Sequence, residues 1–121
     1  MHLVATYDWE IKKSRFVGLL YLIDDLEQFK ILYQKIKTDY TRADHICYAY
    51  QIQNQAKYSD AGEPKGTAGR PLYNLLNYYD LNNVCLVVVR YFGGIKLGAG
   101  GLLRAYRKTG SQTLKIWKQT K

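Results

Sequence analysis

The order of hydrophobic and polar positions predicts strands that alternate with helices. Residues 3–7 and 15–23 are short apolar segments and predict the first two strands. Residues 43–52 alternate, so that His45 and Cys47 share one face of a third strand while the intervening residues share the other. Residues 84–89, VCLVVV, are apolar without interruption, which is typical of a strand buried on both faces.

Three further segments carry apolar residues at helical spacing. The first has an N-cap at Asp24 or Asp25 and runs to about Lys37. The second opens at Arg70 and Pro71, because proline is favoured in a first helical turn. The third runs from about Gly101 to Lys118. Its apolar side holds Leu103, Tyr106, Leu114 and Trp117, and its other side holds Arg104, Arg107, Lys108, Lys115 and Lys118.

Residues 54–69, NQAKYSDAGEPKGTAG, predict a long irregular loop rich in turn-forming residues. An ordered loop of this length in a small domain often has a function. Asp60, Glu63 and Thr67 form a candidate polar site, in which the two acids would hold a cation or move a proton. Turn capping and solvation are the simpler interpretation, and we favour them.

The length of 121 residues predicts one domain, and the composition is ordinary for a soluble globular protein. No apolar run reaches membrane-spanning length and the N-terminus lacks a signal-peptide pattern, so we expect a cytoplasmic protein without a membrane partner. Cys47 and Cys85 are expected to be buried thiols. A packed Cys47 beside a hydrogen-bonded His45 is favoured over a reactive pair, because only distant acids would orient the imidazole.

Positive charge is concentrated in the last third of the chain. Residues 1–80 hold ten basic and ten acidic side chains, whereas residues 81–121 hold eight basic ones and no acid, which accounts for the formal net charge of +8. Clustered cations attract phosphate groups and release their counterions. The distribution predicts a phosphate-bearing partner, with a solvated basic face as the alternative.

A glycine-rich motif follows the buried apolar run. Residues 90–104, RYFGGIKLGAGGLLR, place glycines and Lys96 between a strand and the start of a helix. Glycines allow close backbone approach and a helix N-terminus offers free N–H groups, so the motif predicts an anion cradle, unless the glycines serve only tight turns. It is neither a Walker loop nor a dinucleotide fingerprint. With no zinc spacing or nucleophile motif either, we predict no metal, no cofactor and no catalytic residue, although catalysis stays an open question.

Three segments together resemble the IMPACT/YigZ family: HICYAY at residues 45–50, SDAGEPKGTAGRP at 59–71, and residues 83–106 with RYFGGIKLGAGGLLRAY. Lys13 to Phe16 also fit. The resemblance covers about residues 3–118 and implies that residues 1–121 are a single N-terminal domain of the family. The second, ferredoxin-like domain of longer members is expected to be absent here. Ala61 departs from the family pattern, in which an acidic or amide residue is usual.

The resemblance implies an α+β fold similar to the second domain of small-subunit ribosomal protein five. That fold has a mixed or antiparallel sheet of about four to five strands, with two main helices packed on one face. Related domains in the translocation elongation factor and in ribonuclease P protein touch RNA, and eukaryotic IMPACT resembles a regulator of translation initiation that acts through a protein partner. Kinship of fold alone does not establish a site.

Three functional hypotheses follow. The first is a translation-linked regulatory domain that binds RNA or the ribosome through a basic glycine-rich surface, with Tyr91 or Phe92 stacking on a base. The second is an enzyme or sensor for a small phosphorylated ligand held between residues 59–70 and 93–101. The third is a protein–protein module in stress or translation control. A binding role is favoured over catalysis, and the predicted phosphate-binding residues are Arg70, Arg90, Gly93, Gly94, Lys96, Gly98, Gly100, Gly101, Arg104 and Arg107.

Overall fold

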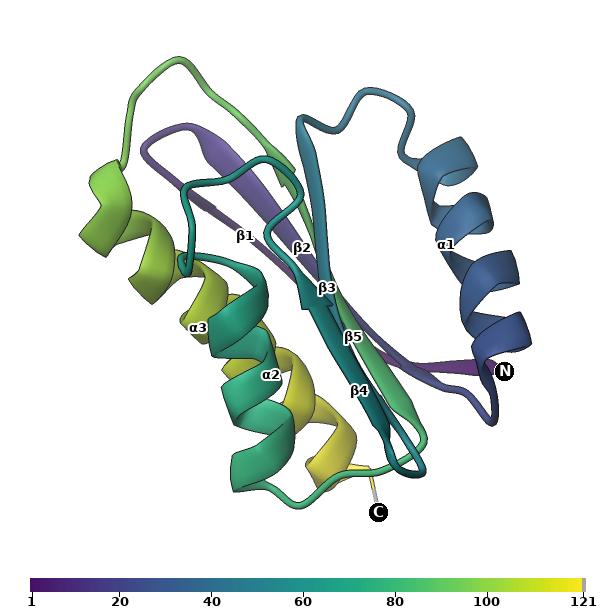
Figure 1. Cartoon of the computed structure of the whole chain (residues 1–121). Helices are drawn as coiled ribbons and strands as arrows, with labels where there is room; N and C mark the ends of the chain where they lie inside the picture. The colour runs from purple at the N-terminus through teal and green to yellow at the C-terminus, as the bar shows by residue number, and fades with distance from the viewer. Residues whose placement is uncertain (121) are drawn as a thin grey trace.

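The computed structural model describes residues 1–120, which form one five-stranded sheet and three helices (Figure 1). The strands are β1 (His2–Ile11), β2 (Ser14–Leu22), β3 (His45–Ile52), β4 (Gln55–Ser59) and β5 (Val84–Tyr91). The helices are α1 (Leu26–Asp39), α2 (Gly69–Tyr78) and α3 (Gly98–Gln119). The strand order is β1-β2-β5-β3-β4 and every neighbouring pair is antiparallel, which confirms the predicted α+β class.

Strand β5 occupies the centre of the sheet, between β2 and β3. Val88 lies opposite Gly18 on one side and opposite Cys47 on the other. Residues 84–90 of β5 are all buried. The unbroken apolar run was therefore correctly interpreted as a strand covered on both faces.

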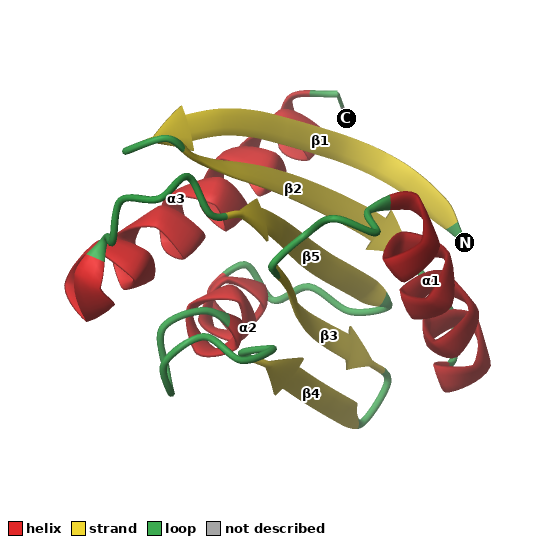
Figure 2. Cartoon of the chain, turned by 90° about the horizontal axis from the view of Figure 1, so that it is seen from above, coloured by secondary structure: helices red, strands yellow, loops and turns green. Residues whose placement is uncertain are grey.

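Two separate cores cover the two faces of the sheet. Figure 2 shows α2 and α3 together on one face and α1 on the other. Cys47 and Ala49 of β3 belong to the core beneath α2 and α3, whereas Tyr48 and Tyr50 belong to the core beneath α1. The alternation predicted for β3 and the pair of helices on one face are thus both confirmed.

Small residues set the depth at which α3 lies on the sheet. A Cβ added to Gly18 of β2 would lie 2.1 Å from Thr113 Oγ1, and one added to Gly110 would lie 2.8 Å from side-chain atoms of Leu72 and Leu75. The Thr109 and Thr113 hydroxyls donate to carbonyls one turn earlier in the helix, so their burial leaves no unpaired group. Close packing fixes α3 against both β2 and α2.

The structure corrects several predicted boundaries, and β1 is longer than the strand predicted over residues 3–7. Residues 55–59, predicted as part of a long loop, form the edge strand β4, whose side chains are mostly exposed. An exposed edge strand does not need apolar alternation, so its sequence resembles a loop. Helix α3 begins at Gly98 instead of Gly101, which places three of the predicted loop glycines in its first turn. Among the described residues, no helix is both long enough and apolar enough to cross a bilayer.

Candidate functional site

The last buried residue of β5 is the centre of a polar network. Arg90 is 5% exposed, and its Nη1 donates to both carboxylate oxygens of Glu63, at 3.0 and 2.9 Å. Its Nη2 donates to Ser14 Oγ at 3.3 Å, while its buried Nε has no hydrogen-bond partner among residues 1–120. The guanidinium also lies 5.6 Å from the Phe16 ring centroid and 5.4 Å from that of Phe92. The buried guanidinium is therefore paired with a carboxylate and lies near two aromatic rings.

Glu63 is the carboxylate that balances this charge. It is 7% exposed, and besides Arg90 it accepts a hydrogen bond from the Tyr106 hydroxyl of α3. Burial, followed by the neighbouring Cys47 and Glu63, raises the pKa of Tyr106 far above its ordinary value, so the phenol keeps the proton that it donates. The network ties the loop before α2 to both β5 and α3.

His45 completes the polar network from the start of β3. Its Nδ1 lies 2.8 Å from the carbonyl oxygen of Ala61, and since a carbonyl only accepts, Nδ1 carries a hydrogen. Its Nε2 lies 3.4 Å from Glu63 Oε1. The two side chains therefore form an ion pair when the imidazole is doubly protonated, and place two acceptors face to face when it is not. The sequence suggested no nearby group to orient His45, and the structure corrects this by supplying Ala61 and Glu63.

Cys47 lies behind His45 and is not reactive. Its sulfur lies 3.3 Å from the Asp60 carbonyl oxygen and 3.4 Å from the Tyr106 hydroxyl oxygen, so its single hydrogen can be donated to either one. Burial raises the pKa of the Cys47 thiol to about 12, so it remains protonated at neutral pH. Both cysteines are free and buried, which confirms the prediction of packed thiols.

The loop acids have different roles. The Asp60 carboxylate accepts hydrogen bonds from the backbone N–H groups of Gly66, Ala68 and Gly69, at 2.9, 3.1 and 2.9 Å, and so holds the loop and the start of α2. Thr67 donates to the Pro64 carbonyl within the same turn. Of the three predicted polar-site residues, Glu63 lines the cavity described next. No group of three or more His, Cys, Asp or Glu residues that would hold a metal ion occurs within residues 1–120.

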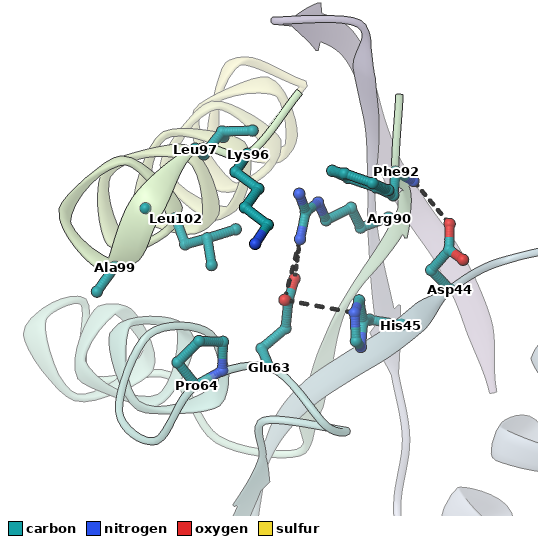
Figure 3. Close-up of a pocket in the computed structure, with 11 residues that line it drawn as sticks. Asp44, His45, Glu63, Pro64, Arg90, Phe92, Lys96, Leu97, Ala99 and Leu102 are labelled. Carbon is teal, nitrogen blue, oxygen red and sulfur yellow. Dashed lines mark hydrogen bonds and ion pairs between the residues drawn. The ribbon is translucent and has the colours of Figure 1, made fainter. Parts of the chain in front are cut away.

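A cavity of about 380 Å³ opens beside the buried ion pair, and we call it the Glu63 cavity (Figure 3). Lys96 makes no hydrogen bond or ion pair with another described residue, and it extends toward Arg90 and Glu63. The first residues of α3 form the opposite wall, and no side chain within residues 1–120 caps that helix. The lining residues are Asp44, His45, Glu63, Pro64, Arg90, Phe92, Lys96, Leu97, Gly98, Ala99 and Leu102.

Two of the predicted cradle glycines are required by the backbone. Gly94 and Gly98 have φ values of 91° and 73°, in the left-handed region that disfavours other residues. Gly93 permits a close approach, since an added Cβ would lie 1.9 Å from the carbonyl oxygen of Lys13. Gly98, Gly100 and Gly101 all lie in the first turn of α3, and Gly98 also lines the Glu63 cavity. The motif thus combines turn geometry with an open helix terminus.

The predicted cations do not form one site. Arg90 is buried, Lys96 lines the Glu63 cavity, and Arg70 and Arg107 are exposed on α2 and α3. Arg104 lines a second cavity of about 300 Å³ between β1 and α3, which we call the Trp9 cavity. Its lining residues are Trp9, Ile11, Lys12, Leu97, Gly101, Arg104, Ala105 and Lys108. Trp9 and Lys12 were not among the predicted site residues. The signal that could have found them is the apolar–polar alternation of residues 9–11, which indicates a first strand longer than predicted.

Comparison with known proteins places these features in a family. The model of the Impact N-terminal domain matches residues 12–114. The chain is 43% identical over 117 residues to an IMPACT family member of Haemophilus influenzae, covering 93% of this chain and 57% of that protein. It is 47% identical over 107 residues to YvyE of Bacillus subtilis, covering 86% and 49%. It is 40% identical over 111 residues to YigZ of Escherichia coli, covering 88% and 54%.

Two solved structures share the fold. One, described as a hypothetical protein, is 39% identical with a TM-score of 0.88, over 92% of this chain and 56% of that one. The other, the two-domain translational regulator Yih1, is 22% identical with a TM-score of 0.58, over 93% and 46%. The chain spans about half the length of these curated relatives. The matches confirm the resemblance that the three sequence segments predicted.

Proposed function

We propose that this chain, which belongs to the Impact N-terminal domain family, is a translation-linked binding domain that engages RNA phosphates through helix α3. The translation context comes from the structural neighbour Yih1, which is described as a translational regulator. The proposal includes no catalysed reaction.

The observation that carries the proposal is the charge of α3. Its residues from Gly98 to Gln119 include no acid, and its five basic side chains, Arg104, Arg107, Lys108, Lys115 and Lys118, are all exposed. On the adjacent strand β1, Trp9 and Ile11 pack toward α3, so the intervening Glu10 points to the other face of the sheet. An exposed row of cations without neighbouring carboxylates attracts phosphate and gives salt-dependent binding.

By the same reasoning, we expect Arg90 to stabilise the fold and not to contact RNA phosphates. Its charge is balanced by Glu63 and its side chain is buried, so a phosphate would have to displace an existing ion pair. Arg104 and Arg107 have no such partner among the described residues. They are the residues that we expect to track a phosphate backbone.

Binding of the 121-residue protein to ribosomes and to short structured RNAs across a salt series tests the proposal. Affinity should fall as salt rises, and Arg104→Ala or Arg107→Ala should each reduce the slope of log affinity against log salt by about 0.7–0.9. Arg42→Ala, an exposed arginine between α1 and β3, is the matched control and should leave the slope unchanged. Absence of binding at low salt would contradict the proposal.

A second candidate is a small phosphorylated ligand in the Glu63 cavity. The observation that favours it is that all three family-like segments meet there, together with Lys96 and the uncapped start of α3. The volume of about 380 Å³ suits a small molecule. Calorimetric titration with inorganic phosphate and sugar phosphates should show binding that Lys96→Ala abolishes and that Lys30→Ala, on the far helix α1, leaves intact. Equal affinity of both variants would rule out this candidate.

A further inference from the structure

We infer that the Trp9 cavity holds one unpaired RNA base against the Trp9 ring while the surrounding cations contact its flanking phosphates. The inference rests on the proposed function. It names the position at which a bound RNA strand would be held by stacking of a base in addition to phosphate contacts. Neither Trp9 nor Lys12 belongs to the glycine-rich motif or to the basic stripe of the last helix.

Small residues on α3 leave the space for a base. Trp9 and Ile11 are alternate residues of β1 that face α3, and Gly101, Arg104, Ala105 and Lys108 recur at helical spacing on the facing side. Gly101 and Ala105 have little or no side chain at the positions nearest the strand. A hollow of about 300 Å³ remains between the helix and the strand, and larger side chains at these positions would fill it.

The Trp9 ring is held in place, is half-buried and lines the cavity. Its Nε1 donates to Thr109 Oγ1 at 2.8 Å, which fixes the ring plane. It packs against the fully buried Phe16, its cross-strand neighbour, with ring centroids 5.9 Å apart and planes 27° apart. On the solvent side the exposed Lys108 places its Nζ 4.3 Å from the ring centroid. An exposed lysine is flexible, so a base can replace its ammonium on the ring and the ammonium can move to a phosphate.

The charges around the cavity suit a nucleotide. Three cations, Lys12, Arg104 and Lys108, line it, and none of the described residues that line it is acidic. A flat apolar ring among unbalanced cations matches a ligand that joins an aromatic base to phosphates. The Glu63 cavity differs, because Glu63 and Asp44 lie among its cations.

The turn beside the cavity provides an independent observation. Lys12 and Lys13 join β1 to β2 with φ values of 47° and 66°, so both occupy the left-handed region. A two-residue hairpin of this kind favours Asn-Gly, and lysine at both positions is strained. Strain at a site points to a role for the side chains that cause it. Here one of the two strained residues, Lys12, lines the cavity.

The test uses the full chain carrying Trp117→Phe, so that Trp9 is the sole tryptophan. We would titrate this protein with a uridine oligomer of about eight nucleotides and with an abasic oligomer of equal length and charge. The uridine oligomer should quench Trp9 fluorescence and bind about tenfold more tightly than the abasic one at the same salt. Lys115→Ala, in the same helix but outside the cavity, should weaken both oligomers equally.

The outcomes separate the two proposals. Binding of both oligomers with equal affinity and unchanged Trp9 fluorescence would overturn the base site while leaving phosphate binding by α3 intact. Failure of both to bind at low salt would overturn the proposed function and the base site together. Equal quenching by uridine monophosphate at the same concentration would show a free-nucleotide site and overturn the assignment to a strand. In Trp9→Leu, checked for folding by circular dichroism, the preference for the uridine oligomer should disappear.

Discussion

The Glu63 cavity and the Trp9 cavity are neighbours that share Leu97, yet they use positive charge in different ways. In the first, the buried Arg90 is paired with a buried carboxylate, and the pair joins the loop before α2 to β5 and α3. In the second, Lys12, Arg104 and Lys108 surround an aromatic ring without a carboxylate among the described lining residues. A balanced charge supports the fold, while an unbalanced one is available to a ligand.

The largest expected effect is the loss of stability on removing the Glu63 carboxylate, which has no counterpart in the Trp9 cavity. Glu63→Ala leaves Arg90 charged, buried and unpaired, and should lower the free energy of unfolding by about 3–5 kcal/mol. Urea denaturation followed by circular dichroism measures this loss. Glu10→Ala, which removes an exposed acid of β1, should change stability by less than about 0.5 kcal/mol. A loss below about 1 kcal/mol for Glu63→Ala would show that the ion pair does not support the fold.

Alkaline pH should lower the free energy of unfolding, in part through Cys47. Burial raises the pKa of this thiol from 9.0 to about 12 in the folded protein. The unfolded chain therefore loses the proton first, and the stability present below pH 9 is lost as pH rises toward 12. The slope contributed by one such group is at most about 1.4 kcal/mol per pH unit.

Urea unfolding at about pH 7.5 and about pH 10 measures this effect, and Cys47→Ala should show a smaller decrease between the two. Cys85, whose pKa burial also raises, remains in the variant and keeps part of the dependence. Tyr78→Phe, a change on the exposed surface of α2, serves as the control and should retain the full decrease. If the free energy of unfolding decreases equally in Cys47→Ala and in the unaltered protein, Cys47 does not contribute to the pH dependence.

The turn beside the Trp9 cavity should show opposite effects on stability and binding. Lys12→Asn combined with Lys13→Gly supplies residues that tolerate positive φ, and should raise the free energy of unfolding by about 0.5–1 kcal/mol. The same variant should bind the uridine oligomer more weakly, because a cation is removed from the cavity lining. Thermal unfolding and fluorescence titration give the two values. If the variant gains stability and binds the uridine oligomer with unchanged affinity, the turn is not part of the proposed site.

The smallest expected effect concerns Ala61, next to the Glu63 cavity. Its φ of 46° lies in the left-handed region, which asparagine adopts more readily than alanine. Ala61→Asn should therefore stabilise the protein by about 0.5 kcal/mol. Ala56→Asn, on the exposed edge strand β4, should give no such gain. The left-handed backbone at this position would account for an acidic or amide residue there, and alanine is the less favoured choice.

Much of the fold was predictable from local pattern. The three helices and the central strand were recognised because apolar residues recur at the periods of buried elements. Strand β4 was missed because a largely exposed edge carries no apolar alternation. The start of α3 was placed three residues late, since glycines in a first helical turn look like a loop.

The sequence by itself determined the α+β class, the packed thiols and the acid-free basic third, because periodicity, residue type and charge are properties of neighbouring positions. Tertiary structure alone decided which cation has a partner. Glu63 and Arg90 are 27 positions apart, and Trp9 and Thr109 are 100 apart. No local pattern reports such pairs, because antiparallel pairing and the packing of α3 on the sheet bring them together. Arg90 and Arg104 belong to the same basic segment. Only folding pairs Arg90 with Glu63 and places Arg104 in the cavity that Trp9 lines.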